Sequence, residues 1–249
     1  MGTFKTSLLI AVISVFIFTG SIYAAEQLKI TVFTDATWPP MEMVDKNKNI
    51  VGFEIDLFNE IAKEAGFKAE FKNTAWDGIF AAMKGNRYPS TCALSSITIT
   101  DERKKSYDFS DPYITVNQVL IVPKTLKVQN TNDMKGKKVG AQIGTTGAME
   151  VKKSNGVVSK TYDEIGLAFA DMAAGRIDGV VCDTPVARDY ALHKSEYKDK
   201  FKIGLEIPTK EQLGIMTKKG DKKVLDLINK GLRAVKAKGI DKQIEKKWL

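Results

Sequence analysis

The sequence EIDLFNEIAKEAG, residues 54–66, decides the fold class of this chain because it predicts an amphipathic helix between two strands. The flanking strands are predicted at residues 28–34 and 68–72, and Gly66 ends the helix. Strands that alternate with helices form a parallel or mixed sheet, so we expect an α/β fold. The apolar side chains of the helix recur on one face at Ile55, Phe58, Ile61 and Ala62.

Further elements continue in the same alternating order along the chain. Hydrophobic periodicity and glycine positions predict each of them. They are a helix at 76–84, strands at 91–94 and 138–142, a helix from Thr146, a helix at 164–174, a strand at 177–182, and C-terminal helices at 222–236 and 241–248.

Two such α/β units would form a ligand-binding cleft if the carboxyl ends of their strands face each other. The C-terminal helices must return to cover the first unit, so the chain passes between the units twice, near residues 113–119 and 206–212. Two connections define a hinge. We expect lobe I at residues 26–115 plus 208–249 and lobe II at residues 116–207.

Residues 1–24 have the pattern of a secretory signal peptide, with a basic Lys5, an apolar run at residues 8–18 and small residues up to Ala25. The apolar run is shorter than the roughly 20 residues that span a bilayer. No cysteine stands where a lipoprotein carries its lipid. We expect cleavage near Ala24 or Ala25 and a soluble mature protein in the periplasm.

Composition excludes several classes of function. The net charge of +8 comes from short lysine pairs with acidic residues close by, which indicates a solvated surface and no nucleic-acid partner. Cys92 and Cys182 lie in apolar runs of different lobes, where a disulfide would lock the hinge, so we expect buried free thiols. The single histidine, His193, lies in a polar run, which argues against a His-dependent metal site or catalytic triad. We expect no metal, no cofactor and a monomer.

Four short motifs carry a resemblance to a known family: Gly52-Phe53-Glu54-Ile55-Asp56-Leu57, Trp76-Asp77-Gly78-Ile79, Thr98-Ile99-Thr100-Asp101-Glu102-Arg103-Lys104-Lys105 and Phe109-Ser110-Asp111-Pro112-Tyr113. Through them the chain closely resembles the polar-amino-acid periplasmic binding proteins of ABC importers, solute-binding protein family 3. The resemblance implies a type II periplasmic-binding-protein fold, in which each lobe is a mixed sheet flanked by helices and two crossovers form the hinge. It also implies that the protein is no enzyme: it binds a free α-amino acid by hinge closure and delivers it to a membrane permease.

An amino acid presents a carboxylate and an ammonium on one carbon, and the site must satisfy both. Arg103 offers a planar fork for the carboxylate. The helix start at 144–147 offers further N–H donors, with Thr146 favoured over Thr145. Asp183, at the end of a buried strand, matches the family's acceptor for the ammonium. The remaining expected ligand-binding residues are Asp35, Trp38, Trp76, Ser95, Ser96, Thr98 and Gln142.

The class of amino acid follows from the positions around the ligand's side chain. Trp38 and Trp76 match the aromatic positions that flank this side chain in the family, and Asp35 matches a position that faces a distal cation. Two indole faces and a carboxylate favour a cation. Arginine, lysine, ornithine or histidine is therefore expected, with glutamine or another polar amino acid as the alternative.

Most of these residues also have a structural interpretation. The two tryptophans would serve in core packing, the Ser/Thr cluster in a loop, and a threonine of 144–147 as a helix N-cap. Asp178 starts the strand that ends at Asp183 and is expected to be structural. The segment 86–91 departs from the family pattern, and Pro89 within it predicts a bulge or a late strand start, which bears on where the serines lie.

An enzyme on the same scaffold is the rival interpretation, since some relatives of this fold are cyclohexadienyl or arogenate dehydratases. Such chemistry needs a general acid near the leaving hydroxyl, for which Glu42 and Glu150 are the candidates next to the cleft. The pairing of Arg103 with Asp183 favours binding. A soluble chemoreceptor-type sensor would differ only in its partner.

Overall fold

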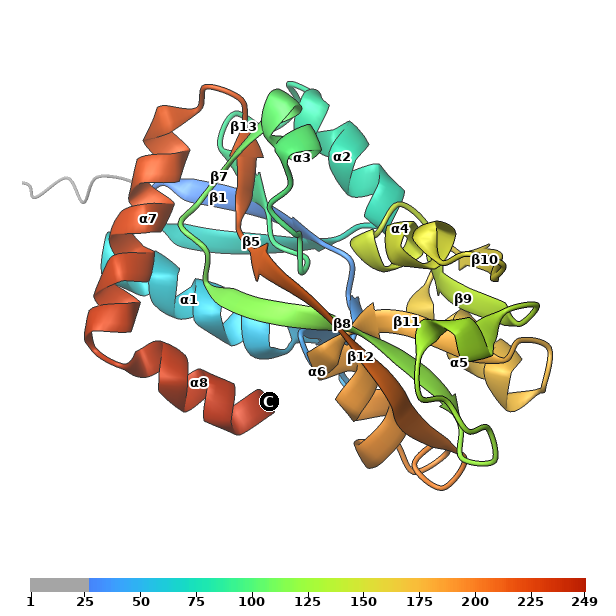
Figure 1. Cartoon of the computed structure of the whole chain (residues 1–249). Coiled ribbons are helices and arrows are strands. Elements are labelled where there is room, and N and C mark those ends of the chain that lie inside the picture. Colours follow the sequence, from blue (N-terminus) through green and yellow to red (C-terminus); the bar gives the residue numbers. More distant parts are fainter. Residues whose placement is uncertain (1–26) are drawn as a thin grey trace, which may run out of the picture.

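Two five-stranded sheets, one in each of two lobes, organise the protein (Figure 1). This computed structural model describes residues 27–249, so the predicted signal peptide, residues 1–24, lies outside the described residues. The predicted two-lobed α/β architecture is confirmed. The elements predicted from periodicity form within two residues of their expected limits.

The first sheet consists of β1 (Lys29–Thr34), β5 (Lys68–Asn73), β6 (Thr91–Ala93), β7 (Tyr107–Phe109) and β13 (Met216–Lys218). Its order is β5-β1-β6-β13-β7. β1 pairs in parallel with β5 and β6, whereas β13 pairs antiparallel with β6 and β7, so the sheet is mixed. A small antiparallel sheet precedes the first helix and contains β2 (Thr37–Trp38), β3 (Glu42–Val44) and β4 (Ile50–Val51).

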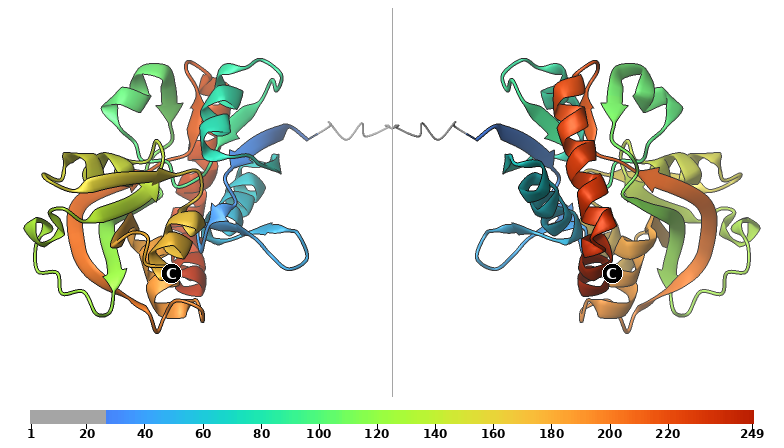
Figure 2. Two further views of the ribbon diagram at one scale, coloured as in Figure 1. Left: turned by 90° about the vertical axis from the view of Figure 1, so that its right-hand side faces the viewer. Right: turned by 90° about the vertical axis from the view of Figure 1, so that its left-hand side faces the viewer.

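Helices cover both faces of the first sheet. Because side chains alternate along a strand, Ile30 of β1 faces one core and Phe33 faces the other. The helices of this lobe are α1 (Phe53–Ala65), α2 (Trp76–Lys84), α3 (Asp101–Ser106), α7 (Lys222–Ala237) and α8 (Ile240–Trp248). The core on the side of Ile30 includes apolar residues of α1 and α7, and the core on the side of Phe33 includes those of α2. Figure 2 shows α7 along the outside of the lobe.

Helix α1 forms and ends where the sequence predicts. Its buried residues include the apolar set at Ile55, Phe58, Ile61 and Ala62. Gly66 then adopts a left-handed conformation with φ of 82°, and its N–H donates to the carbonyl oxygen of Ala62. Glycine takes this conformation without a Cβ clash, which is why the helix stops there.

The second sheet has the order β10-β9-β11-β8-β12 and is also mixed. β9 pairs in parallel with β10 and β11, while β8 pairs antiparallel with β11 and β12. Its strands are β8 (Ile114–Pro123), β9 (Lys138–Gln142), β10 (Val158–Tyr162), β11 (Gly179–Asp183) and β12 (Phe201–Leu213). The helices of this lobe are α4 (Thr146–Lys153), α5 (Ile165–Ala173) and α6 (Thr184–Arg188), with a 3-10 helix at Thr131–Met134 and a π-helix at Asp189–His193.

The two passages between the lobes are the long strands β8 and β12, which pair with each other and cross from one lobe to the other in Figure 1. The sequence predicted two crossings but not that they would be one continuous antiparallel ribbon. The pairing has register shifts between Ile203 and Leu205 and between Ile207 and Glu211. The lobe boundaries at 115/116 and 207/208 stay a prediction.

The unusual segment before β6 has a simple structural outcome. β6 begins only at Thr91, two residues after Pro89, as a late strand start predicts. Lys218 donates from its Nζ to the carbonyl oxygens of Gly85 and Tyr88 and so ties this loop to β13. β6 still pairs in parallel with β1, and Ser95 and Ser96 follow closely after it.

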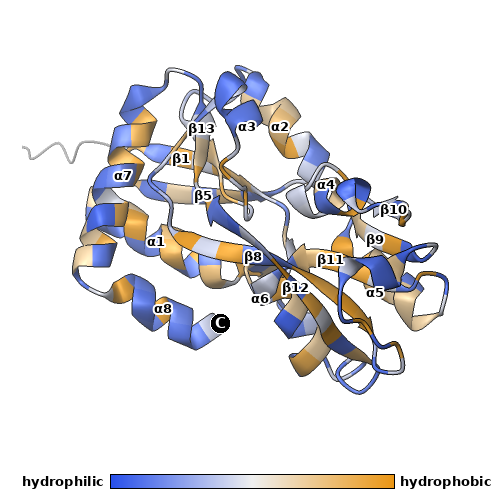
Figure 3. Cartoon of the chain, viewed as in Figure 1, coloured by the Kyte–Doolittle hydropathy of each residue, from blue (hydrophilic) through white to orange (hydrophobic). Residues whose placement is uncertain are grey.

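Burial follows the hydropathy of the sequence. Figure 3 shows hydrophilic outer surfaces on α7 and α8, with hydrophobic residues toward the sheet. Cys92 in β6 and Cys182 in β11 are buried in different sheets. Within residues 27–249, no helix is both long and apolar enough to cross a membrane.

Gly231 marks the closest approach of α7 to α1, and this gives a stability prediction. A Cβ at Gly231 would lie 2.3 Å from the carbonyl oxygen of Ile61. We expect Gly231→Ala to lower the free energy of unfolding by about 1–3 kcal/mol, because the two helices would have to move apart. Urea denaturation measures the change. Gly78→Ala in α2 is the control, since its Cβ would meet only the side chain of Thr74, at 3.3 Å. Equal stability of Gly231→Ala and the wild type would contradict this packing.

Candidate binding site between the lobes

A small, largely closed cavity lies between the lobes. Residues from both lobes line it, and all ten residues predicted from sequence are among them: Asp35, Trp38, Trp76, Ser95, Ser96, Thr98, Arg103, Gln142, Thr146 and Asp183. Two other lining residues, Thr145 and Gly147, belong to the helix start at 144–147 that was considered from sequence, whereas Gln118 and Cys182 were not predicted to line the site.

Arg103 enters the cavity from the short helix α3. Thr100 caps this helix by accepting a hydrogen bond from the backbone N–H of Arg103. The guanidinium donates from Nη1 to the carbonyl oxygen of Thr98, at 2.8 Å, and from Nη2 to that of Gly144 in the second lobe, at 3.3 Å. Its carbon lies 5.4 Å from the ring centroid of Trp76. Since a guanidinium has five N–H donors, several stay available to an anion.

Burial lowers the pKa of Arg103 to about 10, and Glu211 and Asp183 oppose that shift. The group stays cationic at neutral pH. Glu211 and, to a smaller extent, Asp183 favour the cationic form of Arg103.

Asp183 ends β11 and is buried. Its Oδ1 accepts a hydrogen bond from Nε2 of Gln118, at 2.7 Å, and its Oδ2 accepts one from Nε1 of Trp38, at 3.2 Å. Burial raises the pKa of Asp183 to about 7, and the charge of Glu211 adds to this shift. No cation pairs with Asp183 among the described residues, so a cationic ligand group would relieve the cost of burying this carboxylate.

Gln118 holds Asp183 because the sheet register places them side by side. β8 pairs antiparallel with β11, and Gln118 is the partner of Asp183. Gln118 is almost fully buried. The signal in the sequence was a polar residue directly before the apolar run Val119–Val122, in a segment assigned only to the hinge.

Asp35 and Gln142 form a second contact between the lobes. Gln142 donates from Nε2 to Oδ2 of Asp35, at 2.8 Å. Asp35 also accepts from Thr37 Oγ1, and its N–H donates to Ser95 Oγ. Burial raises the pKa of Asp35. These bonds hold the carboxylate of Asp35 in the cavity lining. Among the described residues, no cation forms a salt bridge with it.

The two tryptophans combine both of the roles considered from sequence. Trp38 and Trp76 are each 7% exposed and belong to the apolar cores, yet both line the cavity. Trp76 also lies against the second lobe at Gly144, where a Cβ would be 3.1 Å from Nε1 of Trp76. Gly144 has a φ of 71°, so a glycine suits this position for two reasons.

Ser95 and Ser96 are held from below by two buried glutamates. Ser95 Oγ donates to Oε1 of Glu42, at 2.9 Å, and the N–H and Oγ of Ser96 both donate to Glu54. Tyr113 donates its hydroxyl to Glu54 as well. The hydroxyl hydrogens of both serines thus point to the buried glutamates.

Glu42 and Glu54 are within hydrogen-bond reach of each other, and both are buried. Burial raises the pKa of both, and the neighbouring charge of Glu54 raises that of Glu42 further. Tyr113 and Ser96 donate to Glu54 and favour its ionised form, so burial shifts Glu42 more strongly than Glu54 toward the protonated form. The sequence placed Glu54 in a helix and in the motif at residues 52–57, but it did not predict the bonds from Ser96 and Tyr113.

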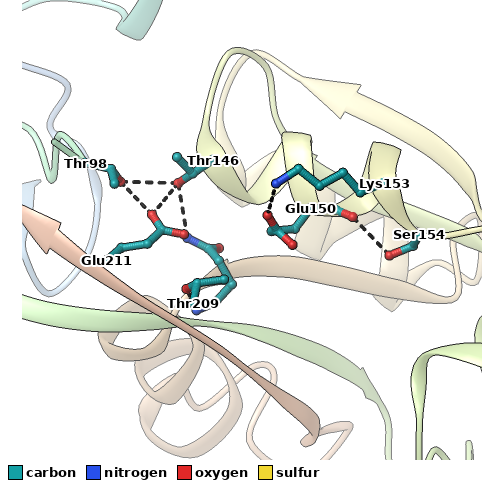
Figure 4. A network of polar contacts seen from close by, with 8 residues as sticks. Thr98, Thr146, Glu150, Lys153, Ser154, Thr209 and Glu211 are labelled. Atoms are coloured by element: carbon teal, nitrogen blue, oxygen red, sulfur yellow. Dashed lines mark hydrogen bonds and ion pairs between the residues drawn. The ribbon is translucent and has the colours of Figure 1, made fainter. Parts of the chain in front are cut away.

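The helix start at 144–147 was considered both as a helix cap and as part of the ligand site, and Thr145 and Thr146 take different places in it. Thr145 is the N-cap of α4, and its Oγ1 accepts from the N–H of Ala148. Thr146 is the first helical residue, and its Oγ1 donates to Oε2 of Glu211, at 2.6 Å (Figure 4). Glu211, on β12, was not predicted from sequence.

The remaining acids considered from sequence lie away from the cavity lining. Glu42 is enclosed beneath Ser95, and Glu150 on α4 pairs with Lys153 at 2.6 Å (Figure 4). Asp178 accepts from the N–H of Lys138 and pairs with Lys137, which is a structural role. Within residues 27–249, no cluster of His, Cys, Asp and Glu is arranged to hold a metal ion.

A family model for bacterial extracellular solute-binding proteins, family 3, matches residues 30–249. The chain belongs to this family. A probable histidine-binding protein of Neisseria gonorrhoeae is 36% identical to this solute-binding protein over 84% of this chain and 78% of that one. ABC transporter arginine-binding protein 1 of Escherichia coli is 32% identical over 98% of each chain.

Solved structures show the same two-lobed fold. An ancestral arginine-binding protein bound to arginine has a TM-score of 0.83 and 40% identity to this solute-binding protein, covering 89% of this chain and 98% of that one. The ancestral amino-acid-binding protein AncCDT-1, a precursor of cyclohexadienyl dehydratase, has a TM-score of 0.78 and 35% identity, covering 88% and 94%. The fold is thus shared by binding proteins and by a precursor of an enzyme.

The two buried glutamates have different hydrogen-bond roles, which predicts different responses to the same substitution. Glu54→Gln places an amide N–H₂ at the position of Oε2, against the N–H of Ser96 that this oxygen accepts at 3.0 Å, so we expect the free energy of unfolding to fall by about 1–3 kcal/mol. In Glu42→Gln the amide is neutral, as a protonated Glu42 is, and keeps an oxygen that can accept from Ser95, so the change should stay within about 1 kcal/mol. Urea denaturation of this solute-binding protein at pH 7 measures both. A larger loss for Glu42→Gln than for Glu54→Gln would contradict the assigned roles.

Proposed function

We propose that this protein captures a free α-amino acid with a cationic side chain in the cavity between its lobes. The observation that carries the proposal is the presence of Arg103 and Asp183, from opposite lobes, in one buried cavity. An α-amino acid carries the two charges that complement them. A ligand with only one of these charges would leave the other residue buried without a partner.

The carboxylate end of the ligand would bind to Arg103 and to the start of α4. The guanidinium fork suits a carboxylate, and Thr146 and Gly147, the first two residues of α4, line the cavity, where their backbone N–H groups could serve as further donors. The ammonium end would bind to Asp183, which Gln118 and Trp38 hold in place.

The side chain of the ligand would lie between the tryptophans toward Asp35. A cation there would gain from the indole faces and from a buried carboxylate. Relatives named as histidine-binding and arginine-binding proteins support a basic amino acid. Glutamine or another polar amino acid is the second candidate. The amide of Gln142, which donates to Asp35, can instead form a hydrogen bond with a neutral group of the ligand.

The ligand would couple binding to closure of the hinge. Only the closed form brings both sets of contacts onto one ligand, so binding favours closure. The closed lobes would then be recognised by the membrane permease of an ABC importer. We place the mature protein in the periplasm as a monomer, released by cleavage near Ala24 or Ala25, with lobes at 26–115 plus 208–249 and 116–207.

A dehydratase is the rival function, and the similarity to AncCDT-1 gives it weight. The acids nominated for such chemistry, Glu42 and Glu150, are absent from the cavity lining. The paired ligand clamp and the binding-protein relatives support binding without catalysis.

The test of the proposal is calorimetric titration of refolded, ligand-free protein with the twenty amino acids and ornithine. We expect micromolar or tighter binding of a basic amino acid. Arg103→Ala and Asp183→Ala should each weaken it by at least about tenfold, since each leaves a ligand charge without its partner. Absence of binding for all of them, with turnover of prephenate or arogenate, would support the dehydratase.

The pKa of Asp183 predicts how affinity depends on pH. An ammonium ligand favours the ionised carboxylate, so the pKa of about 7 falls on binding. Above pH 7 the affinity should be constant, and below it binding must release a proton. Between pH 7 and pH 5.5 we expect a loss of at most roughly thirtyfold, measured by calorimetry. In Asp183→Asn this loss should be smaller. An affinity that rises on acidification would contradict the assignment of Asp183 to the ammonium.

A further inference from the structure

Glu211 joins the two lobes through a single carboxylate oxygen. Its Oε2 accepts a hydrogen bond from Oγ1 of Thr98 in the first lobe, at 2.7 Å, and one from Oγ1 of Thr146 in the second lobe, at 2.6 Å (Figure 4). Glu211 itself lies on β12, in the ribbon that connects the lobes. Both threonines line the cavity, whereas Glu211 lies behind them.

The bonds to Glu211 fix the direction of both hydroxyl hydrogens. A carboxylate accepts hydrogen bonds and has no hydrogen to donate, and each hydroxyl has only one. The hydrogens of Thr98 and Thr146 therefore point to Glu211, although the two hydroxyl oxygens are 3.3 Å apart. The oxygen of Thr146 also accepts from Nε2 of Gln118, at 3.3 Å. The oxygen of Thr98 keeps a free lone pair toward the cavity.

This geometry makes the Thr98 hydroxyl an acceptor and removes the Thr146 hydroxyl as a donor to a carboxylate. The charge of Glu211 also acts on Asp183 and on Arg103. The nearest cation on α4, Lys153, is paired with Glu150. The side of the cavity at Thr98 and Asp183 is thus suited to a positive group.

We propose that Glu211 is a positioning residue of the amino-acid site: it ties Thr98 to Thr146 across the closed lobes and turns the Thr98 hydroxyl oxygen into an acceptor for the ligand's ammonium. This inference rests on the proposed function for its ligand, but the tie between the lobes exists in the protein itself. The carboxylate acts without touching the ligand, through the threonine that does.

The test compares two substitutions with L-arginine as the probe in calorimetry. Glu211→Ala removes the acceptor, and we expect affinity to fall roughly tenfold or more. Glu211→Gln keeps one carbonyl oxygen, and one oxygen is all that the two threonines use, so its affinity should return to within about threefold of the wild type. Equal losses in both variants would overturn the positioning role.

Two further comparisons separate positioning from general damage. Glu206→Gln removes the same charge from the same strand at an exposed site and should change affinity by less than about twofold. Thr98→Val combined with Glu211→Ala should lose little more than the larger single variant, because both remove one linked unit. Additive losses would overturn the link through Thr98.

The tie between the lobes is tested without any ligand. X-ray scattering of ligand-free Glu211→Ala should give a larger radius of gyration than the ligand-free wild type, since one contact across the hinge is lost. An unchanged radius would overturn the tie. If the wild type bound no amino acid, the proposed function would fail, and the scattering comparison alone would decide the tie.

Discussion

The antiparallel pairing of β8 with β12 is the constraint on which the rest of the site depends. The ribbon is the only part of the described chain, residues 27–249, that carries strand pairing from one lobe to the other. Its register places Gln118 beside Asp183 on one edge and beside Ile207 on the other. It also carries Glu211 to the point where Thr98 and Thr146 meet. Residues of the connecting ribbon, Gln118 and Glu211, thus determine how the two halves of the site are held together.

Charge balance in a closed cavity explains why ligand binding and closure belong together. Burial raises the pKa of Asp183 to about 7 and lowers that of Arg103 to about 10, so both charges are disfavoured in the empty closed form. A zwitterion supplies a counter-charge to each at once. The same balance limits the ligand. A molecule without both an anionic and a cationic group would leave Arg103 or Asp183 without a counter-charge.

Much of the site was predictable because its residues occupy recognisable motifs. Arg103 stands in a helix start rich in polar residues, and Asp183 ends an apolar strand, so each has a local signal. Gln118, Glu54 and Glu211 lacked such a signal. A glutamine in a hinge segment or a glutamate on a helix is ordinary in sequence, and each gains its role only from partners on other elements.

The sequence by itself determined the alternation of strands and helices, the ends of α1 and, through motifs that resemble those of the family, ten of the side chains that line the cavity. These depend on periodicity, glycine positions and motifs, which are local properties of the chain. Only the tertiary structure decided the direction of each hydrogen bond in the site. Thr98 and Glu211 are 113 positions apart, and Thr146 and Glu211 are 65 apart. Whether a threonine hydroxyl donates to a ligand or accepts from it depends on which carboxylate folding brings beside it, and no local pattern records that.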